Sequence, residues 1–235
     1  MLNKQYCGAN SIMQQSIQNL IWILGKAIYH NYFYLESYGT EKLTENCGYL
    51  IVVNHISHLD GPAVIAAHGK HLKYMFSLAA KDYFFDRPWK CRLYTYLFNM
   101  IPIERNGKFK NCLKTCKSIL ARGDCILFFP EGTRSSTGEM QPMKLGLGFL
   151  VMNLRVPIVP AYISGTFQAL PKGMRFPKKH PICVRFGVPL EFSHCQNQVN
   201  KEDRNKLYQE ITVQIESAIK DLKNSSIQTG LTTDF

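Results

Sequence analysis

The stretch Tyr49-Leu50-Ile51-Val52-Val53-Asn54-His55-Ile56-Ser57-His58-Leu59-Asp60 decides how the chain folds. Its unalternating run, rich in Val and Ile, predicts a strand buried on both faces that ends abruptly at Asn54-His55. Ser57 and Asp60 have the spacing of a capping box, which predicts a helix beginning at Ser57 and running to about Ala67. We therefore expect His55 in a loop at the carboxyl end of a strand, where open α/β sheets bind ligands.

Further apolar runs alternate with segments of helical periodicity along the rest of the chain. Strands are expected within residues 33–43, 72–78, 100–103, 125–129, 156–163 and 182–186, and helices near 11–34, 83–98, 108–122, 144–153 and 200–222. Such alternation predicts an α/β fold with a central, largely parallel mixed sheet flanked by helices. We divide the chain into an N-terminal amphipathic, membrane-associating helical segment (1–34), one domain (35–223) and a polar tail (224–235).

The first of these helices is amphipathic and rich in aromatic residues. Its apolar and polar residues recur at helical spacing: Ile17, Leu20, Ile21, Leu24, Ala27 and Ile28 against Gln14, Gln15, Gln18, Asn19 and Lys26. Two interpretations are open, an in-plane membrane helix and a helix packed on the core. We favour a hybrid, with one side on the core and one rim in lipid. No stretch reaches the roughly 20 apolar residues of a membrane-spanning helix, so we expect the chain to lie on a bilayer rather than to cross it.

The positive charge lies in the middle of the chain. Of its 28 Lys and Arg and 17 Asp and Glu residues, 20 and 6 fall between Lys70 and Arg185. A basic region of this kind attracts phosphates, anionic lipid surfaces or nucleic acid. The sequence contains no recognised nucleic-acid module, and aromatic residues do not alternate with the basic residues of the helix at 108–122. We therefore expect an anionic membrane surface, and no nucleic acid, as a partner.

The cysteines and histidines predict neither disulfides nor a metal site. The eight cysteines include no C-x-x-C pair, and the first residues lack the pattern of a cleavable signal peptide, so we expect reduced thiols in a cytoplasmic setting. His55, His58 and Asp60 lack the further His/Cys cluster that would complete a metal site, so no metal is expected.

Polar clusters follow three of the apolar runs: Asn54-His55 with Asp60, Glu104-Arg105, and Glu131-Gly132-Thr133-Arg134. If these runs are neighbouring parallel strands, the clusters meet at one edge of the sheet. An imidazole beside a carboxylate makes a general base, and guanidinium groups bind phosphate through paired donors. Such a site suits a substrate that carries a hydroxyl near a phosphate.

The same residues resemble the motifs of the glycerolipid acyltransferases, of the 1-acylglycerol-3-phosphate acyltransferase type. Residues 54–60 match the N-H-x-x-x-x-D motif, 101–105 (Ile-Pro-Ile-Glu-Arg) the second motif, 129–135 (Phe-Pro-Glu-Gly-Thr-Arg-Ser) the third and 156–160 (Val-Pro-Ile-Val-Pro) the fourth. The resemblance covers about residues 35–195, with the motifs in the family's order and spacing. The second motif usually has Gly where this chain has Asn99. Since Asn tolerates left-handed backbone better than most residues, we expect the turn to be kept.

The resemblance implies an acyl transfer in which His55 takes the proton from an acceptor hydroxyl and Asp60 orients His55. It implies that a set of loop and basic residues holds the glycerol phosphate: Arg105, Glu131, Gly132, Thr133, Arg134 and Lys144. Acyl-CoA or acyl-carrier protein is the donor and co-substrate, no other cofactor is implied, and no covalent acyl-enzyme is expected. The implied role is in phospholipid biosynthesis, by a peripheral enzyme at the cytoplasmic face of a membrane. The simplest reaction converts 1-acyl-sn-glycerol 3-phosphate to phosphatidic acid.

Several alternatives remain open at this point. The acceptor is another lysophospholipid, such as a lysophosphatidylethanolamine, or the chain is a non-catalytic basic lipid-binding protein. Arg105 and Arg134 bind phosphate, or they are structural ion-pair partners of Glu104 and Glu131. His58 is expected at the surface or behind the catalytic residues, and no pattern indicates an oligomeric state.

Overall fold

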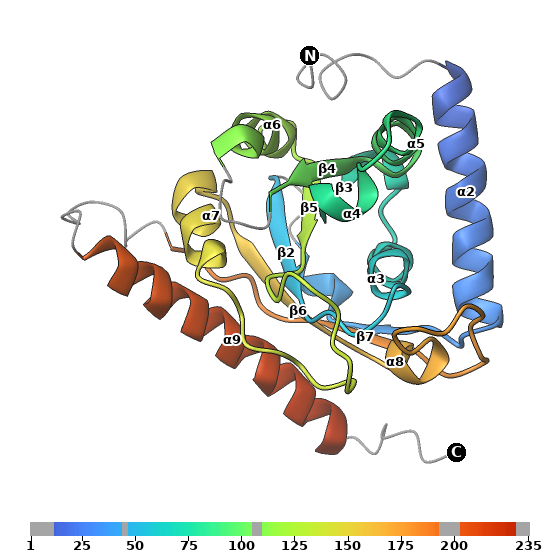
Figure 1. Ribbon diagram of the computed structural model, residues 1–235. Helices are drawn as coiled ribbons and strands as arrows, with labels where there is room; N and C mark the ends of the chain where they lie inside the picture. Colours follow the sequence, from blue (N-terminus) through green and yellow to red (C-terminus); the bar gives the residue numbers. More distant parts are fainter. Residues whose placement is uncertain (1–11, 44–46, 105–109, 193–202, 229–235) are drawn as a thin grey trace.

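The computed structural model of the protein describes residues 12–43, 47–104, 110–192 and 203–228. Within these residues, the centre is a seven-stranded sheet in the order β1-β7-β6-β2-β5-β3-β4 (Figure 1). The strands are β1 (Glu36–Tyr38), β2 (Tyr49–Val53), β3 (Met75–Ala80), β4 (Met100–Ile103), β5 (Cys125–Phe128), β6 (Ile158–Ser164) and β7 (Cys183–Phe186). The strands from β6 to β4 in this order are parallel, while β7 and β1 run the other way at one edge. The predicted α/β class with a largely parallel sheet is confirmed.

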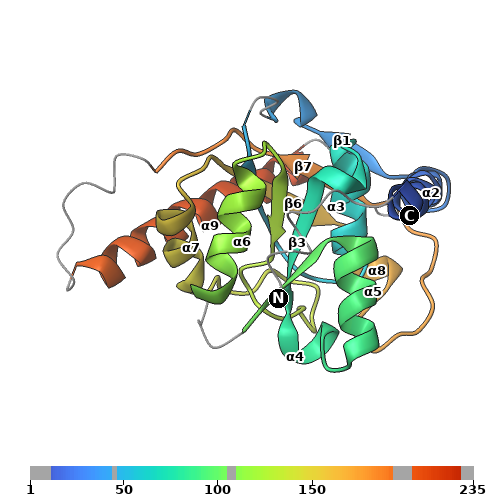
Figure 2. The same cartoon turned by 90° about the horizontal axis from the view of Figure 1, so that it is seen from above.

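Helices cover both faces of the sheet (Figures 1 and 2). They are α2 (Ile12–Asn31), α3 (Asp60–His68), α4 (Lys81–Phe84), α5 (Pro88–Phe98), α6 (Lys110–Leu120), α7 (Gly146–Leu154), α8 (Thr166–Ala169) and α9 (Arg204–Gln228), with short 3-10 turns at Thr40–Lys42 and Leu72–Tyr74. Buried residues of α6, α7 and α9 pack on one face of the sheet. Those of α3 pack on the other face, and α2 lies outside α3 and α5 as an additional layer.

β2 lies in the middle of the sheet, between β6 and β5. Its residues Leu50 and Val52 belong to the core on the α6, α7 and α9 side, whereas Tyr49, Ile51 and Val53 belong to the core on the α3 side. All five side chains are at most 1% exposed. A strand that is buried on both faces has no polar alternation, which explains its continuous apolar run.

The structure corrects the predicted start of α3 and confirms the turn expected after α5. α3 begins at Asp60 and not, as predicted, at Ser57. The Asp60 carboxylate accepts the amides of Ile56 and Ser57 at 2.7 and 2.8 Å, which holds these residues in a loop before the helix. α5 begins at Pro88 and is followed by Asn99 in the left-handed conformation with φ 51°. The turn expected at Asn99 is therefore confirmed.

α9 is longer than its sequence predicts. It continues to Gln228, so the predicted end of this helix near residue 222 is wrong. The hydroxyls of Ser225 and Ser226 donate to carbonyls four residues earlier, at 2.8 and 2.9 Å. Hydroxyls bonded in this way need no other partner, so polar residues continue the helix.

α2 turns Gln14 and Gln18, and not most of its aliphatic residues, toward the protein. Gln14 and Gln18 are 7% and 0% exposed. Their Nε2 groups donate to the Tyr96 carbonyl at 2.8 Å and to Asn99 Oδ1 at 3.1 Å, respectively. The last carbonyls of a helix lack partners within it, and the glutamines supply donors at the end of α5. One side of α2 therefore packs on the protein, as expected, and the buried residues of that side are Gln14, Gln18 and Tyr29.

The aliphatic side of α2 faces away from the protein. The large apolar residues that are 52–86% exposed there are Ile12, Met13, Leu20, Ile23, Leu24 and Ile28. Among the described residues, no helix has both the length and the apolar character that crossing a bilayer requires.

Candidate active site

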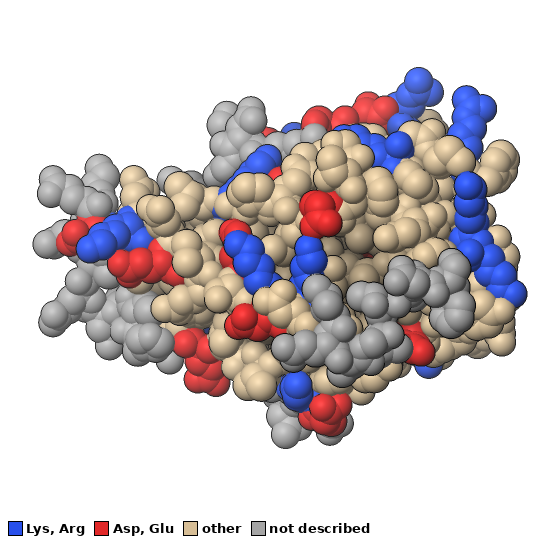
Figure 3. Space-filling view, turned by 90° about the horizontal axis from the view of Figure 1, so that it is seen from below, with Lys and Arg blue, Asp and Glu red and all other residues tan. Residues whose placement is uncertain are grey.

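The polar clusters that follow β2 and β5 meet at one edge of the sheet, because these strands are parallel neighbours. The cluster after β4 lies farther along this edge, since β3 separates β4 from β5. Arg105 lies outside the described residues. Its neighbour Glu104 pairs with Lys81, whose Nζ is 3.5 Å from Oε1. Figure 3 views the molecule from below relative to Figure 1 and shows Lys and Arg side chains near the middle of that face and along one margin.

His55 and Asp60 form a hydrogen-bonded pair. The Nδ1 atom of His55 lies 2.8 Å from Oδ2 of Asp60. The imidazole is 22% exposed, whereas the carboxylate is fully buried. The imidazole ring stacks on Phe129, with ring centroids 4.2 Å apart. Because Nδ1 is bonded to the carboxylate, Nε2 is the nitrogen that can accept a proton from a bound molecule.

Three further donors hold the Asp60 carboxylate. Oδ2 also accepts the amides of residues 56 and 57, and Oδ1 accepts the hydroxyl of Thr166 at 2.5 Å. Thr166 is fully buried and begins α8 directly after Gly165, at the end of β6. Gly165 has φ 86°, and a Cβ added there would collide with the carbonyl oxygen of Pro181. Glycine at this position therefore lets the chain turn so that Thr166 reaches the carboxylate.

Glu131 is buried, and both of its carboxylate oxygens accept backbone amides. Oε1 accepts the amide of His55 at 2.8 Å, and Oε2 accepts the amide of Gln141 at 3.2 Å. Burial raises the pKa of Glu131 to about 7, although these two amides favour the charged form. Since both oxygens are engaged inside the protein, the geometry favours support of the His55 backbone over the predicted direct contact between Glu131 and substrate.

Gly132 and Lys144 lie against each other beside the His55 loop. Gly132 has φ 73°, and its amide donates to the Phe129 carbonyl at 3.2 Å in a tight turn. A Cβ added to Gly132 would lie 2.8 Å from Nζ of Lys144, so the lysine side chain crosses directly over the glycine. The Lys144 amide donates to the Pro130 carbonyl at 3.1 Å. The structure thus brings together two of the residues predicted to hold phosphate.

Thr133 and Arg134 follow in the same loop, the first exposed and the second partly buried. Partial burial of the ring lowers the pKa of His58, and the nearby charge of Arg134 lowers that pKa further. His58 is exposed, and its Nε2 lies 3.2 Å from the hydroxyl of Tyr83, which agrees with its expected place at the surface. Among the described residues, Glu131 is bonded to backbone amides and not to Arg134, so the ion pair considered for these two residues is not present.

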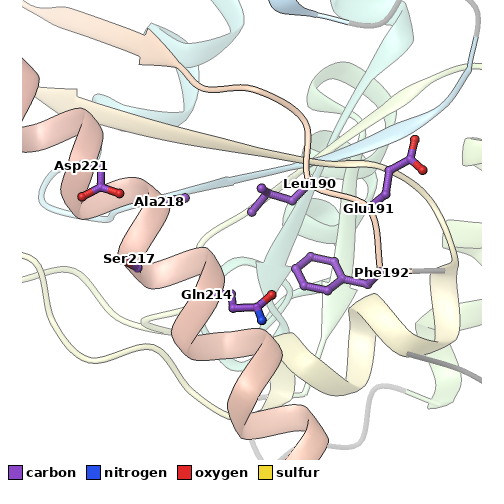
Figure 4. A pocket seen from close by; sticks show the side chains of 7 residues that line it. All are labelled: Leu190, Glu191, Phe192, Gln214, Ser217, Ala218 and Asp221. Carbon is purple, nitrogen blue, oxygen red and sulfur yellow. The ribbon is translucent and has the colours of Figure 1, made fainter. Parts of the chain in front are cut away.

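A separate pocket of about 350 Å³ lies between α9 and the segment at 190–192 (Figure 4). The residues that line it are Leu190, Glu191, Phe192, Gln214, Ser217, Ala218 and Asp221. None of the residues of the His55–Asp60 loop lines this pocket, so it is not part of the candidate site. In the part of the chain that the structure describes, no group of three or more His, Cys, Asp and Glu side chains could hold a metal ion.

Sequence reasoning assigned no role to Asn54, Phe129 or Thr166. Asn54 is 1% exposed and links β2 to β6: its Nδ2 donates to the Ile163 carbonyl at 3.0 Å, and its Oδ1 accepts the Ile163 amide at 2.8 Å. Thr166 could have been found by the rule that found the other clusters, because it is a polar residue just after a buried strand. The stacking of Phe129 on His55 has no signal in the sequence, because it depends on how two strand ends align.

Comparison with known proteins identifies related sequences. A model of the acyltransferase family matches residues 34–164, more than half of the chain. The chloroplastic 1-acyl-sn-glycerol-3-phosphate acyltransferase BAT2 of Brassica napus is 34% identical over 79 residues, which are 33% of this chain and 23% of that protein. A 1-acyl-sn-glycerol-3-phosphate acyltransferase of Bacillus subtilis (strain 168) is 28% identical over 187 residues, which are 73% of this chain and 89% of that protein. The matches span only 23% to 36% of the length of the first curated relatives.

A solved structure has the same fold. The crystal structure of the 1-acyl-sn-glycerophosphate (LPA) acyltransferase PlsC from Thermotoga maritima matches with a TM-score of 0.64 at 20% sequence identity. The match covers 94% of this chain and 86% of that chain. The sheet and its flanking helices therefore form a known α/β arrangement.

Proposed function

We propose that this chain, which belongs to the acyltransferase family, transfers a fatty acyl group from acyl-CoA or acyl-carrier protein to the free hydroxyl of a lysophospholipid. The first acceptor that we propose is 1-acyl-sn-glycerol 3-phosphate, which the names of the Brassica napus and Bacillus subtilis relatives contain. Its product is phosphatidic acid. The observation that carries this proposal is the His55–Asp60 pair, 2.8 Å apart, beside the loop with Arg134 and Lys144. A base next to cationic groups suits a hydroxyl near a phosphate.

In the proposed reaction, Nε2 of His55 takes the proton from the acceptor hydroxyl while its oxygen attacks the thioester carbonyl. The buried Asp60 carboxylate stabilises the imidazolium that forms. When the tetrahedral intermediate collapses, the C–S bond breaks, the thiolate leaves, and the imidazolium gives its proton to the sulfur. Because the substrate supplies the nucleophile, no covalent acyl-enzyme forms.

Cationic groups beside the base hold the acceptor phosphate in this proposal. Arg134 offers paired N–H donors, and Lys144 offers a point charge over the turn at Gly132. Thr133 and the amides of this turn are further donors to a phosphate oxygen. The resemblance to the family's second motif adds Arg105, which lies outside the described residues, to this set. The acceptor hydroxyl then lies toward His55, with its phosphate toward the loop.

The test of the proposed activity is thiol release from palmitoyl-CoA in detergent, with and without 1-acylglycerol 3-phosphate. We expect release that requires the acceptor and that falls by a factor of about 1,000 or more in His55→Ala, because the base is lost. His58→Ala is the matched control, since this exposed histidine of the same loop lies against Tyr83, and we expect its activity within a few-fold of wild type. Full activity in His55→Ala would show that another group is the base.

The nature of the acceptor is tested by competition. We expect 1-acylglycerol 3-phosphate to outcompete lysophosphatidylethanolamine, because a terminal phosphate monoester pairs better with Arg134 and Lys144 than a zwitterionic headgroup does. The opposite order would assign the enzyme to another lysophospholipid. If neither acceptor promotes thiol release from acyl-CoA or acyl-carrier protein, the alternative of a non-catalytic lipid-binding protein gains support.

We place this enzyme peripherally on the cytoplasmic face of a membrane, where its lipid substrates lie. The supporting observation is α2, in which Gln14 and Gln18 face the protein while aliphatic residues such as Leu20, Leu24 and Ile28 are 52–58% exposed. Helices on the surface of water-soluble proteins have the opposite polarity, and an aliphatic side of this kind suits contact with acyl chains. The described cysteines are all free, which agrees with a reducing compartment.

A further inference from the structure

The loop at residues 171–180, which we name the basic loop, lies beside the candidate active site. It follows α8, which itself follows the carboxyl end of β6. The residue just before it, Leu170, accepts a hydrogen bond on its carbonyl from the Ser57 hydroxyl at 2.8 Å. Within the loop, Nζ of Lys172 lies 3.5 Å from the Arg134 carbonyl. The basic loop is therefore attached to both the His55 loop and the loop that follows β5.

The basic loop also adjoins the end of α2 (Figure 1). The Tyr32 hydroxyl lies 3.4 Å from the Pro177 carbonyl, and Nζ of Lys179 lies 4.7 Å from the centroid of the Tyr34 ring. The Lys178 amide donates to the Ala169 carbonyl at 2.7 Å and closes the base of the loop. The loop therefore lies between the residues that follow α2 and the loops of the candidate active site.

The basic loop combines cations with apolar side chains that have no cover. Phe176 is 81% exposed and Met174 is 50% exposed. The cations of the loop are Lys172, Arg175, Lys178 and Lys179, and residues 171–180 contain no Asp or Glu. Solvation alone explains the charges, but water disfavours an exposed Phe and Met. A partner surface with an anionic outer layer and an apolar layer below it matches both the cations and the apolar side chains of the loop.

We propose that the basic loop docks on the headgroup layer of an anionic lipid bilayer. Met174 and Phe176 enter the boundary between headgroups and acyl chains, and the four cations contact lipid phosphates. Tyr32 and Tyr34 lie at the level of the headgroups, where aromatic rings with a polar end are favoured. The inference rests on the proposed function, because it assigns the segment that brings the active site to a surface containing its lipid acceptor.

A soluble anionic partner accounts for less of the structure. A free phosphate compound such as CoA, or an acidic carrier protein, pairs with the cations. Such a partner does not by itself explain why Phe176 projects among them with 81% of its surface exposed. The lipid bilayer accounts for the apolar residues and the cations together, and the dependence of binding on each of them separates the two kinds of partner.

The test is sedimentation of the full chain with vesicles of phosphatidylcholine alone and with vesicles in which part of it is replaced by phosphatidylglycerol. The variants are Phe176→Ser and the double variant Lys178→Gln/Lys179→Gln. The control is Arg204→Gln/Lys206→Gln, which removes two exposed cations from α9, on the other side of the sheet. We expect the loop lysines to contribute roughly fivefold each on anionic vesicles and Phe176 about tenfold on both kinds. The control should bind like wild type.

Two results would overturn the proposal. Wild-type binding by both loop variants would mean that the basic loop is not a contact. Weaker binding by the lysine variant, with Phe176→Ser unchanged, would mean that the loop only attracts anions and that its apolar side chains do not enter the bilayer. Acyl transfer in neutral detergent micelles is measured in parallel, and we expect the loop variants to keep the wild-type rate there. Absence of transfer by wild type would count against the proposed function alone, because vesicle binding is read without turnover.

Discussion

The hydroxyl of Thr166 donates a hydrogen bond to Asp60, with 2.5 Å between Oγ1 and Oδ1, and both side chains are fully buried. Oδ2 of the same carboxylate lies 2.8 Å from Nδ1 of His55. Thr166 therefore acts on the imidazole through Asp60, from a strand end that contributes no other side chain to the pair. A donor to a carboxylate reduces the negative charge that the carboxylate offers to the imidazolium.

Thr166→Val is expected to lower kcat/KM by about 10- to 100-fold, the effect of a lost hydrogen bond to a charged group. It should also move the acid limb of the pH profile of kcat/KM to higher pH, because the freed carboxylate charge stabilises the protonated base. Thr166→Ser keeps the hydroxyl and should restore both the rate and the profile. Other titratable groups near the pair, Glu131, His58 and Tyr29, are the same in both variants. A lower rate with an unmoved acid limb would indicate a role in folding only.

Glu131→Gln should change how stability depends on pH. The pKa of about 7 in the folded protein lies above the ordinary value of 4.5. Between these pH values the native state holds a proton that the unfolded state has lost. The free energy of unfolding therefore falls as pH rises through this range, by up to about 1.4 kcal/mol per pH unit. In Glu131→Gln this part of the dependence of the free energy of unfolding on pH should disappear, because the Gln side chain does not titrate.

Urea unfolding measured across that pH range checks the prediction for Glu131. The control is Glu210→Gln, because Glu210 is an exposed carboxylate on α9 and should leave the slope unchanged. The prediction fails if Glu131→Gln keeps the slope of wild type. The Gln side chain can accept only one of the two backbone amides, so we also expect it to weaken the support of His55 and reduce activity.

The strands of the central sheet could be predicted because burial leaves a local signal. β2 and β5 are continuous apolar runs followed by polar residues, and their neighbouring position was enough to bring His55 and Glu131 together. The order of the strands has no local signal, and β3 lies between β5 and β4 for reasons of packing over long separations. The fold class and the His55–Asp60 pair were thus predictable, whereas the place of the second motif along the edge was not.

The orientation of α2 could not be predicted from its periodicity. An amphipathic pattern shows that two faces exist, and the usual rule turns the apolar face inward. Here the inward face is set by the end of α5, whose carbonyls need donors. The Nε2 group of Gln18 donates to the Tyr96 carbonyl and to Oδ1 of Asn99. The carbonyls that require these donors belong to a segment about 80 residues away, so the pattern within α2 does not indicate them.

Substitutions on α2 should therefore have effects opposite to those on an ordinary surface helix. Gln18→Leu is expected to cost about 1–3 kcal/mol of stability, because it removes the donor to the buried Oδ1 of Asn99, whereas the Tyr96 carbonyl keeps its bond from Gln14. Leu24→Ser, at a residue that is 53% exposed, should change stability by about 0.5 kcal/mol or less and weaken binding to vesicles. Urea unfolding and sedimentation with vesicles measure the two effects. A loss of stability in Leu24→Ser without a loss of vesicle binding would place the aliphatic side against protein instead.

The two described cations beside His55 should act on binding of the acceptor more than on chemistry. Arg134→Gln and Lys144→Gln are expected to raise KM for 1-acylglycerol 3-phosphate by about 10- to 100-fold, the effect of a lost charge-assisted hydrogen bond, with a smaller change in kcat. Arg134→Lys keeps the charge but not the paired donors, so its KM should lie between those of wild type and Arg134→Gln. Arg204→Gln, at an exposed cation on α9, controls for net charge. Steady-state kinetics with varied acceptor measure these changes. An unchanged KM in both variants would mean that the phosphate binds elsewhere along the sheet edge, and the Lys144 side chain over Gly132 would then only support the turn.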